Sequence, residues 1–207
     1  KSPFPEWNYP QLKWTHQPLK IDGEWNSLQS SIEEKLLQED DRFINWSCFQ
    51  PLTKTKVRLG EKSIEGLGYA EKLDLEIDPQ NLPFETLRWG RFTANETSIV
   101  WIEWCGKIPL KLVYLNGVKY ENVDISEESI QIHDVNLELK LTESLELRKG
   151  SLLDTVFKNL HWLIKRFPLK MLSTFECKWR SKGVLVDKNA GKSIKSGWAI
   201  HEIVIWE

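Results

Sequence analysis

Hydrophobic and polar residues alternate with a period of two over most of the chain from about residue 43 onward. The alternation is clearest over residues 53–59, 69–77, 99–105, 110–115, 118–123 and 135–141. Successive side chains of a β-strand point to opposite faces, so this period predicts strands that bury one face. Shorter apolar stretches near 145–147, 171–180 and 198–206 extend the series. The pattern predicts eight to ten short strands.

Turn signals separate these strands. Asn116-Gly117 lies between two apolar stretches, and this dipeptide is the strongest short signal for a β-hairpin. Thr142-Glu143-Ser144 is expected to form a turn between two strands, and the polar residues 181–197 a loop between the last two.

Two stretches have helical spacing instead. Ser151 and Asp154 resemble a capping box, a broad apolar stripe follows, and Pro168 ends it. One long helix is therefore expected over residues 151–167. A shorter helix is predicted over residues 28–38, where apolar residues recur at i, i+4 spacing (Leu28, Ile32 and Leu36).

A parallel α/β fold would need a helix between most strands, and the pattern provides almost none. We therefore expect a mainly β fold, an antiparallel β-barrel of about eight to ten strands, since closure also removes edge strands. An immunoglobulin-like sandwich is the alternative, but its Cys…Trp…Cys spacing is absent. The length predicts one domain over residues 1–207, with residues 1–26, rich in Pro and Trp, as an extended arm.

Charge and cysteine usage exclude several classes of function. The 28 Lys and Arg nearly balance the 30 Asp and Glu, with a net charge of −2. This balance argues against non-specific electrostatic binding to nucleic acid or anionic membrane. No apolar stretch approaches the roughly 18 residues of a membrane helix. The three cysteines form no CxxC pair and no signal-peptide pattern opens the sequence, so we expect a cytoplasmic protein without disulfides.

No cofactor or metal is expected. The four histidines are scattered without metal-ligand spacing. Residues 189–193 end like a phosphate-binding loop, but Val186 stands where that motif needs glycine. We interpret this stretch as part of a hairpin loop.

Tryptophan is the unusual component. The chain has 11 Trp against a single Met. Such a number indicates either an aromatic core or an aromatic-lined pocket. Trp89 and Trp101 lie nearest in sequence to charges that could point inward, so two or three cavity tryptophans are expected, with the others structural.

Glu71 is the first candidate for chemistry. The strand period places it on the face of Tyr69, Leu73 and Leu75, opposite the solvated Lys72 and Asp74. A carboxylate that points inward must be paired or protonated. A structural ion pair and an acid/base role are equally compatible with this placement, and a β-bulge near Gly66 or Gly68 would reverse the faces.

Further charges lie on neighbouring predicted strands. Glu103 shares a face with Trp101, but both faces of its strand are apolar. Arg88 and Arg91 flank Trp89-Gly90 on opposite faces. A guanidinium that points inward could pair with Glu71 or Glu103 or stack on an aromatic ring. A surface arginine covering a tryptophan is the equally compatible alternative.

Two candidates lie near the C-terminus. His201 falls between Ala199 and Ile203, so it is expected to be buried either as a satisfied core residue or as a base. In residues 175–180, alternation places the aromatic side chains on one face and Glu176, Lys178 and Arg180 on the outer face.

Two of these segments together resemble a known family. Gly66-Leu67-Gly68-Tyr69-Ala70-Glu71, followed by Arg88-Trp89-Gly90-Arg91-Phe92, is similar to the G-x-G-Y-x-D/E and W-x-W-G-R segments of lipocalin-like domains in the carotenoid 1,2-hydratase superfamily. That superfamily includes lipocalin-like Diels–Alderases. Leu87 replaces the first Trp of the second motif, and the family usually has two such domains where this chain has room for one.

The resemblance implies a lipocalin-like barrel with an apolar, aromatic cavity and a few buried polar groups. Its enzymes add water to polyenes or related alkenes or guide their cyclisation. Two functions are therefore expected as alternatives. In the first, a cofactor-independent lyase or isomerase uses Glu71 or Glu103 as the acid, oriented by Arg91, and His201 as a further acid/base candidate. Its lipophilic substrate lies against Tyr69, Trp89, Trp101 and Arg88.

In the second, the same cavity carries or senses a small hydrophobic molecule without chemistry. The catalytic hypothesis predicts that Glu71→Gln abolishes turnover and leaves the fold intact, whereas an unfolded variant would make Glu71 structural.

Overall fold

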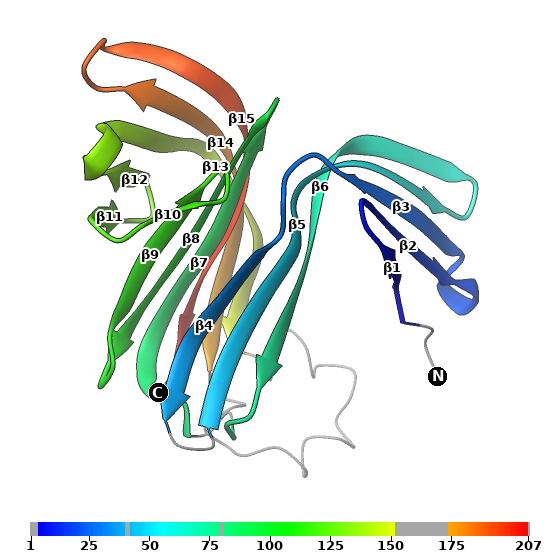
Figure 1. Ribbon diagram of the computed structural model, residues 1–207, viewed down its shortest axis with the longest axis horizontal. Helices are drawn as coiled ribbons and strands as arrows, with labels where there is room; N and C mark the ends of the chain where they lie inside the picture. Colours follow the sequence, from blue (N-terminus) through cyan, green and yellow to red (C-terminus); the bar gives the residue numbers. More distant parts are fainter. Residues whose placement is uncertain (1–3, 40–41, 79–80, 152–173, 207) are drawn as a thin grey trace. The chain divides into compact units, whose positions relative to one another are not determined.

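The computed structural model describes residues 4–39, 42–78, 81–151 and 174–206 (Figure 1). Within these ranges every regular element is a β-strand or a short 3-10 turn. The chain divides into two compact units, residues 1–76 with 96–98 and residues 77–95 with 99–207. The mainly β class is confirmed. The single domain expected from length stays a prediction.

The first unit contains a six-stranded antiparallel sheet. Its strands are β1 (Glu6–Asn8), β2 (Gln11–His16), β3 (Ile21–Ser27), β4 (Ile32–Glu39), β5 (Arg42–Leu59) and β6 (Lys62–Leu75). The long strand β5 pairs with β4 along its first half and with β3 along its second half, and β6 pairs with both halves. The arm expected over residues 1–26 thus contributes β1, β2 and most of β3 to this sheet.

The helix predicted over residues 28–38 is wrong. Strand β4 occupies residues 32–39, and Ile32 lies opposite Cys48 of β5. A register shift between Lys35 and Leu37 lets both Leu36 and Leu37 be buried. Pairing and packing against β5 therefore outweigh the local i, i+4 spacing. The helix expected over residues 151–167 lies, from residue 152 onward, outside the described residues.

The second unit contains a nine-stranded antiparallel sheet in the order β10-β9-β8-β7-β15-β14-β13-β12-β11. Its strands are β7 (Phe84–Ala94), β8 (Thr97–Gly106), β9 (Leu110–Leu115), β10 (Val118–Tyr120), β11 (Val123–Ile125), β12 (Ser129–Ile132), β13 (Leu137–Ser151), β14 (Phe175–Asp187) and β15 (Lys192–Ile205). The hairpin predicted at Asn116-Gly117 is confirmed, and both residues have the positive φ that its turn requires.

The nine-stranded sheet curls until its two ends approach each other, which makes a nearly closed barrel (Figure 1). Near one end of the sheet, the Nζ of Lys111 on β9 lies 3.5 Å from Oδ1 of Asp124 on β11, the strand at the other end. Val113 of β9 and Val123 of β11 belong to the same buried apolar cluster. An antiparallel barrel was expected, but the described residues hold fifteen strands in two sheets rather than eight to ten.

Small residues make room for large rings inside the barrel. A side chain at Gly183 of β14 would lie 2.5 Å from the ring of Phe92. Phe92 is fully buried and packs in a cluster with Ile99, Trp101 and Leu139. The buried cluster of the second unit receives side chains from β7, β8, β9 and each of the strands β11 to β15.

Candidate functional site

The candidate site lies on the inner face of the barrel, where β7, β15 and β14 run side by side. Gly90, His201 and Trp179 lie directly opposite one another on these three strands. His201 shares its face with Ala199 of the core cluster, two residues earlier on β15. Strand alternation thus turns the imidazole toward the interior of the barrel.

His201 is 5% exposed and lies between two tryptophans. The ring of Trp179 stacks on it, with centroids 5.2 Å apart and an interplanar angle of 25°. The Trp101 ring lies 6.1 Å away and is tilted. Burial among apolar rings disfavours the charged form and lowers the pKa of His201 from 6.5 to about 4. The imidazole is therefore neutral at neutral pH.

Trp101 reaches His201 because the intervening strand carries a glycine. A Cβ at Gly90 would lie 2.0 Å from the Trp101 indole. The indole of β8 therefore lies over the bare backbone of β7 and approaches the imidazole on β15. The glycine of the Trp89-Gly90-Arg91 motif has a physical role here, since any side chain would displace Trp101 from His201.

Arg88 and Glu103 form an ion pair on the same face. The guanidinium Nη1 of Arg88 donates to Oε2 of Glu103 over 2.8 Å, and the two side chains are 30% and 15% exposed. Arg88 lies two residues from Gly90, about 7 Å along the strand. Its Nε–H is buried and has no hydrogen-bond partner among the described residues. A buried donor without an acceptor is costly, so this atom marks a place that suits an acceptor.

Of the site residues predicted from the sequence, the structure brings together Arg88, Trp101, Glu103 and His201. Trp89 and Arg91 lie on β7 too, but alternation places them on the opposite face from Arg88 and Gly90. Trp89 lies across from Glu202, and Arg91, which is 3% exposed, lies across from Ile200. Their predicted roles in binding and acid orientation stay predictions.

Tyr69 and Glu71 belong to β6 in the first unit. Glu71 is partly buried and accepts a hydrogen bond of 2.9 Å from the indole N–H of Trp46, which is fully buried. Glu71 shares a face of β6 with Leu73, and Leu73 lies opposite the buried Trp46 of β5. Tyr69, on the same strand, is 37% exposed. Glu71 therefore anchors Trp46, and the catalytic role of Glu71 stays a prediction.

Sequence reasoning missed Ser144, Trp179 and Ser181. The hydroxyl of Ser181 lies 2.8 Å from Nε2 of His201, and the Ser144 hydroxyl lies 2.8 Å from that of Ser181. Ser181 could have been found by extending the alternation of Cys177 and Trp179 by two residues. Ser144 could not, because the strand that carries it changes faces at an irregularity that alternation does not show.

The charges on the outer face of β14 are not simply solvated. Glu176 is buried and pairs with Arg148 and, over 3.8 Å, with Lys178. Lys178 also contacts Glu202 at 2.6 Å. Arg180 is exposed and lies over the Trp198 ring, 4.8 Å from its centroid. These residues form an ordered charge network on the face opposite His201.

A separate cavity of about 290 Å³ lies in the first unit, lined by Thr15, Gln17, Lys20, Ile21, Asp22, Arg58, Gly60 and Glu61. Six of these eight residues have polar or charged side chains, unlike the aromatic lining expected from the resemblance. The described residues contain no group of three or more His, Cys, Asp or Glu placed to hold a metal ion. Over the same ranges, no helix is long and apolar enough to cross a membrane.

Comparison with known proteins supports the fold. No family model matches the chain, and no curated protein matches its sequence. The fold is similar to the crystal structure of kievitone hydratase from Nectria haematococca, with a TM-score of 0.52 and 11% sequence identity. The match covers 95% of this chain but 65% of the hydratase, so this chain spans just under two thirds of its length. At this identity the likeness shows a shared fold alone, and membership of the carotenoid 1,2-hydratase superfamily stays a prediction.

Proposed function

We propose that the inner face of the barrel around His201 binds a lipophilic, unsaturated small molecule that carries an oxygen acceptor. The site then assists its hydration, cyclisation or isomerisation by acid/base chemistry. The observation that carries this proposal is a neutral imidazole buried between Trp101 and Trp179, on the same face as the buried Nε–H of Arg88, for which the described residues provide no acceptor.

The chemistry of the ligand is inferred from these groups. Tryptophan rings provide apolar and polarisable surface for a conjugated hydrocarbon. The Nε–H of Arg88 would be satisfied by a carbonyl or phenol oxygen, and a hydrogen bond from a charged donor is stronger than one between neutral groups. A conjugated ketone satisfies both requirements.

His201 fits the role of general base because its imidazole is neutral at neutral pH. In hydration, Nε2 or Nδ1 would take one proton from water while the water oxygen bonds to one alkene carbon. The electron pair of the double bond moves toward the carbonyl oxygen, where the Arg88 N–H stabilises the developing charge. The imidazolium then returns its proton to the other alkene carbon, which restores the neutral histidine.

The fold likeness supports this class of reaction without fixing the substrate. The similar solved structure is that of a hydratase, an enzyme that adds water. Isomerisation needs the same base and the same donor, because a proton is removed from one carbon and returned to another. The two reactions differ only in whether water enters the site.

Binding can be tested with β-ionone, a lipophilic conjugated ketone, by quenching of tryptophan fluorescence. We expect saturable quenching, and Arg88→Lys should weaken binding at least tenfold, about the value of one hydrogen bond to a charged group. Arg58→Lys is the matched control, since Arg58 forms an exposed ion pair with Asp22 in the first unit. Arg88→Lys and the natural protein should bind an oxygen-free diene of similar size with equal affinity. Absence of saturable quenching would contradict the proposal.

Turnover can be followed in deuterated water by mass spectrometry of the recovered ketone. We expect deuterium at carbons conjugated to the carbonyl, or addition of one water, and His201→Gln should abolish both while leaving β-ionone bound. Binding without deuterium uptake in the natural protein would instead favour the non-catalytic carrier.

A further inference from the structure

A chain of two hydroxyl groups connects His201 with the surface of the barrel. Nε2 of His201 lies 2.8 Å from the hydroxyl of Ser181, which is fully buried. The Ser181 hydroxyl lies 2.8 Å from that of Ser144, a residue that is exposed. The chain therefore begins at a buried ring and ends at a residue in contact with solvent.

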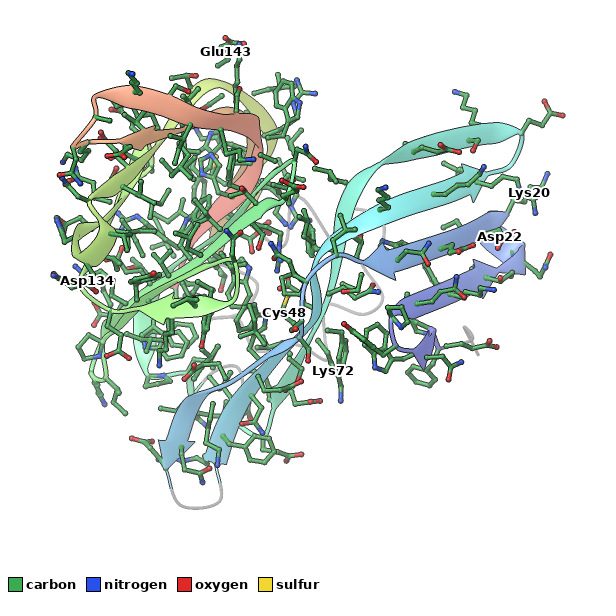
Figure 2. The ribbon with its side chains drawn as sticks, turned by 45° about the horizontal axis from the view of Figure 1, so that its top comes forward. Lys20, Asp22, Cys48, Lys72, Asp134 and Glu143 are labelled. Atoms are coloured by element: carbon green, nitrogen blue, oxygen red, sulfur yellow. The ribbon has the colours of Figure 1, made fainter. Side chains whose placement is uncertain are left out.

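An irregularity in β13 builds the outer end of this chain. Thr142 lies opposite Lys182 and Leu145 opposite Arg180, so β13 holds one residue more than β14 in this interval. Glu143 has the left-handed φ of 50° found in such bulges, and its side chain points away from the barrel (Figure 2). The extra residue places Ser144 on the inner face, opposite Ser181.

Titratable groups on the neighbouring strands contact one another, with Lys149 3.9 Å from Glu146 and Lys111 3.5 Å from Asp124. Arg88 of β7 pairs with Glu103 of β8. The Sγ of Cys177, on β14, lies 4.0 Å from a carboxylate oxygen of Glu146, on β13. Among the described residues, the hydroxyl of Ser181 is the polar group that lies within hydrogen-bond distance of the imidazole.

We propose that Ser144 and Ser181 are positioning residues that carry protons between solvent and His201. This inference rests on the proposed function, in which His201 is a base that must return to its starting state after each turnover. When His201 exchanges its proton with water rather than with the product, its buried imidazole needs a chain of hydrogen bonds that leads to solvent.

A hydroxyl group can accept one proton and donate another at the same time, which is what such a path requires. Inward transfer begins with a hydronium ion at Ser144. The ion gives a proton to Ser144, Ser144 gives its own proton to Ser181, and Ser181 gives its own to Nε2. Water and an imidazolium are formed and both hydroxyls are restored. Outward transfer runs through the same bonds in reverse.

The test measures proton exchange at the His201 ring without any ligand. In protein labelled with ¹⁵N-histidine, saturation transfer from water gives the exchange rate of the ring N–H. We expect Ser181→Ala to slow this exchange at least tenfold, and Ser144→Ala to slow it by a smaller factor. Ser181→Thr, which keeps the hydroxyl, should restore the rate.

Two controls separate proton transfer from general damage to the structure. Ser129→Ala removes the Ser129 hydroxyl, which lies 3.4 Å from that of Ser126 at the turn between β11 and β12, and should leave His201 exchange unchanged. His133, which is exposed and pairs with Asp124, serves as the internal reference in every sample.

An unchanged exchange rate in Ser181→Ala, or in Ser144→Ala should the first variant fail to fold, would overturn the relay. Because no ligand is present, this result is independent of β-ionone binding. Slowed exchange together with absent β-ionone binding would keep the relay and remove the proposed function. Slowed exchange in Ser129→Ala as well would make the serine effect structural and overturn the proposal.

Discussion

At the residue scale, the environment of His201 affects stability as well as chemistry. The folded protein holds this imidazole between two tryptophan rings, and burial lowers its pKa from 6.5 to about 4. In the unfolded chain the same imidazole is solvated and keeps an ordinary pKa. Between pH 6.5 and pH 4 the unfolded chain therefore binds a proton that the folded protein does not.

We predict a loss of stability as the pH falls through this window. The contribution of His201 is fully present above pH 6.5 and decreases toward pH 4, because stability rises with pH wherever the unfolded state binds more protons. A shift of this size corresponds to at most roughly 3 kcal/mol in the free energy of unfolding. His201→Gln should remove this part of the pH dependence, as measured by urea denaturation at pH 4.5, 5.5, 6.5 and 7.5.

His133→Gln is the matched control, because it removes an exposed histidine instead of the buried one. An equally steep decrease in His201→Gln would show that another group causes the acid sensitivity.

The sequence could predict a site residue where strand alternation places it on the same face as a buried neighbour two residues away. His201 follows Ala199 by two residues, and Trp101 precedes Glu103 by two, so each pair shares a face. The same rule separates Arg88 from Arg91. What the sequence could not show was which face of β8 points into the barrel, because both faces are buried there, as Ile102 and Trp101 illustrate. Nor could it show that Glu71 belongs to a different unit, since that depends on contacts far apart in the chain.

At the scale of elements, strand β13 shows where alternation fails. Leu139 and Leu141 are buried in the barrel, whereas Leu145 and Leu147, at positions of the same parity, are each 50% exposed. The sequence predicted a turn at residues 142–144, but β13 is continuous from Leu137 to Ser151. Register shifts at Thr142/Leu145 and at Glu146/Arg148 change the faces without ending the strand. The turn signal at residues 142–144 marked the place of the bulge but not its nature, because the strand continues through it.

The bulge makes a prediction about Glu143. A residue other than glycine pays an energetic cost at a φ of 50°, on the order of 1 kcal/mol. Glu143→Gly should therefore be about 1 kcal/mol more stable than Glu143→Ala in urea denaturation, because both lose the exposed ion pair with Lys182 and only glycine relieves the backbone. Such an exposed pair contributes little.

Gly66→Ala is the control in which a glycine is replaced by alanine, at a strand position where a Cβ would meet nothing within 4 Å. It should change stability little. Equal stability of the two Glu143 variants would contradict a left-handed residue at this position.

At the scale of the whole molecule, the two units differ in how much core they contain. The barrel encloses a continuous apolar cluster that includes Phe92, Trp101, Ile130 and Leu185. In the first unit, the buried apolar side chains are Leu12, Ile32, Leu36, Leu37, Ile44, Trp46, Cys48 and Leu52. The far ends of β5 and β6 expose their apolar residues, with Leu59 at 48% and Ile64 at 61%. A sheet needs a covered face to be stable, so these ends contribute little.

We therefore expect the fragment of residues 1–76 to lack a cooperative unfolding transition when it is produced alone. The fragment of residues 77–207 should keep such a transition, because the barrel cluster lies within it. Far-UV circular dichroism and tryptophan fluorescence during urea titration measure both fragments, and the full chain is the reference. A steep transition in the fragment of residues 1–76 would show that its few buried side chains are enough for independent folding. Two separate transitions in the full chain would then contradict the single domain predicted from its length.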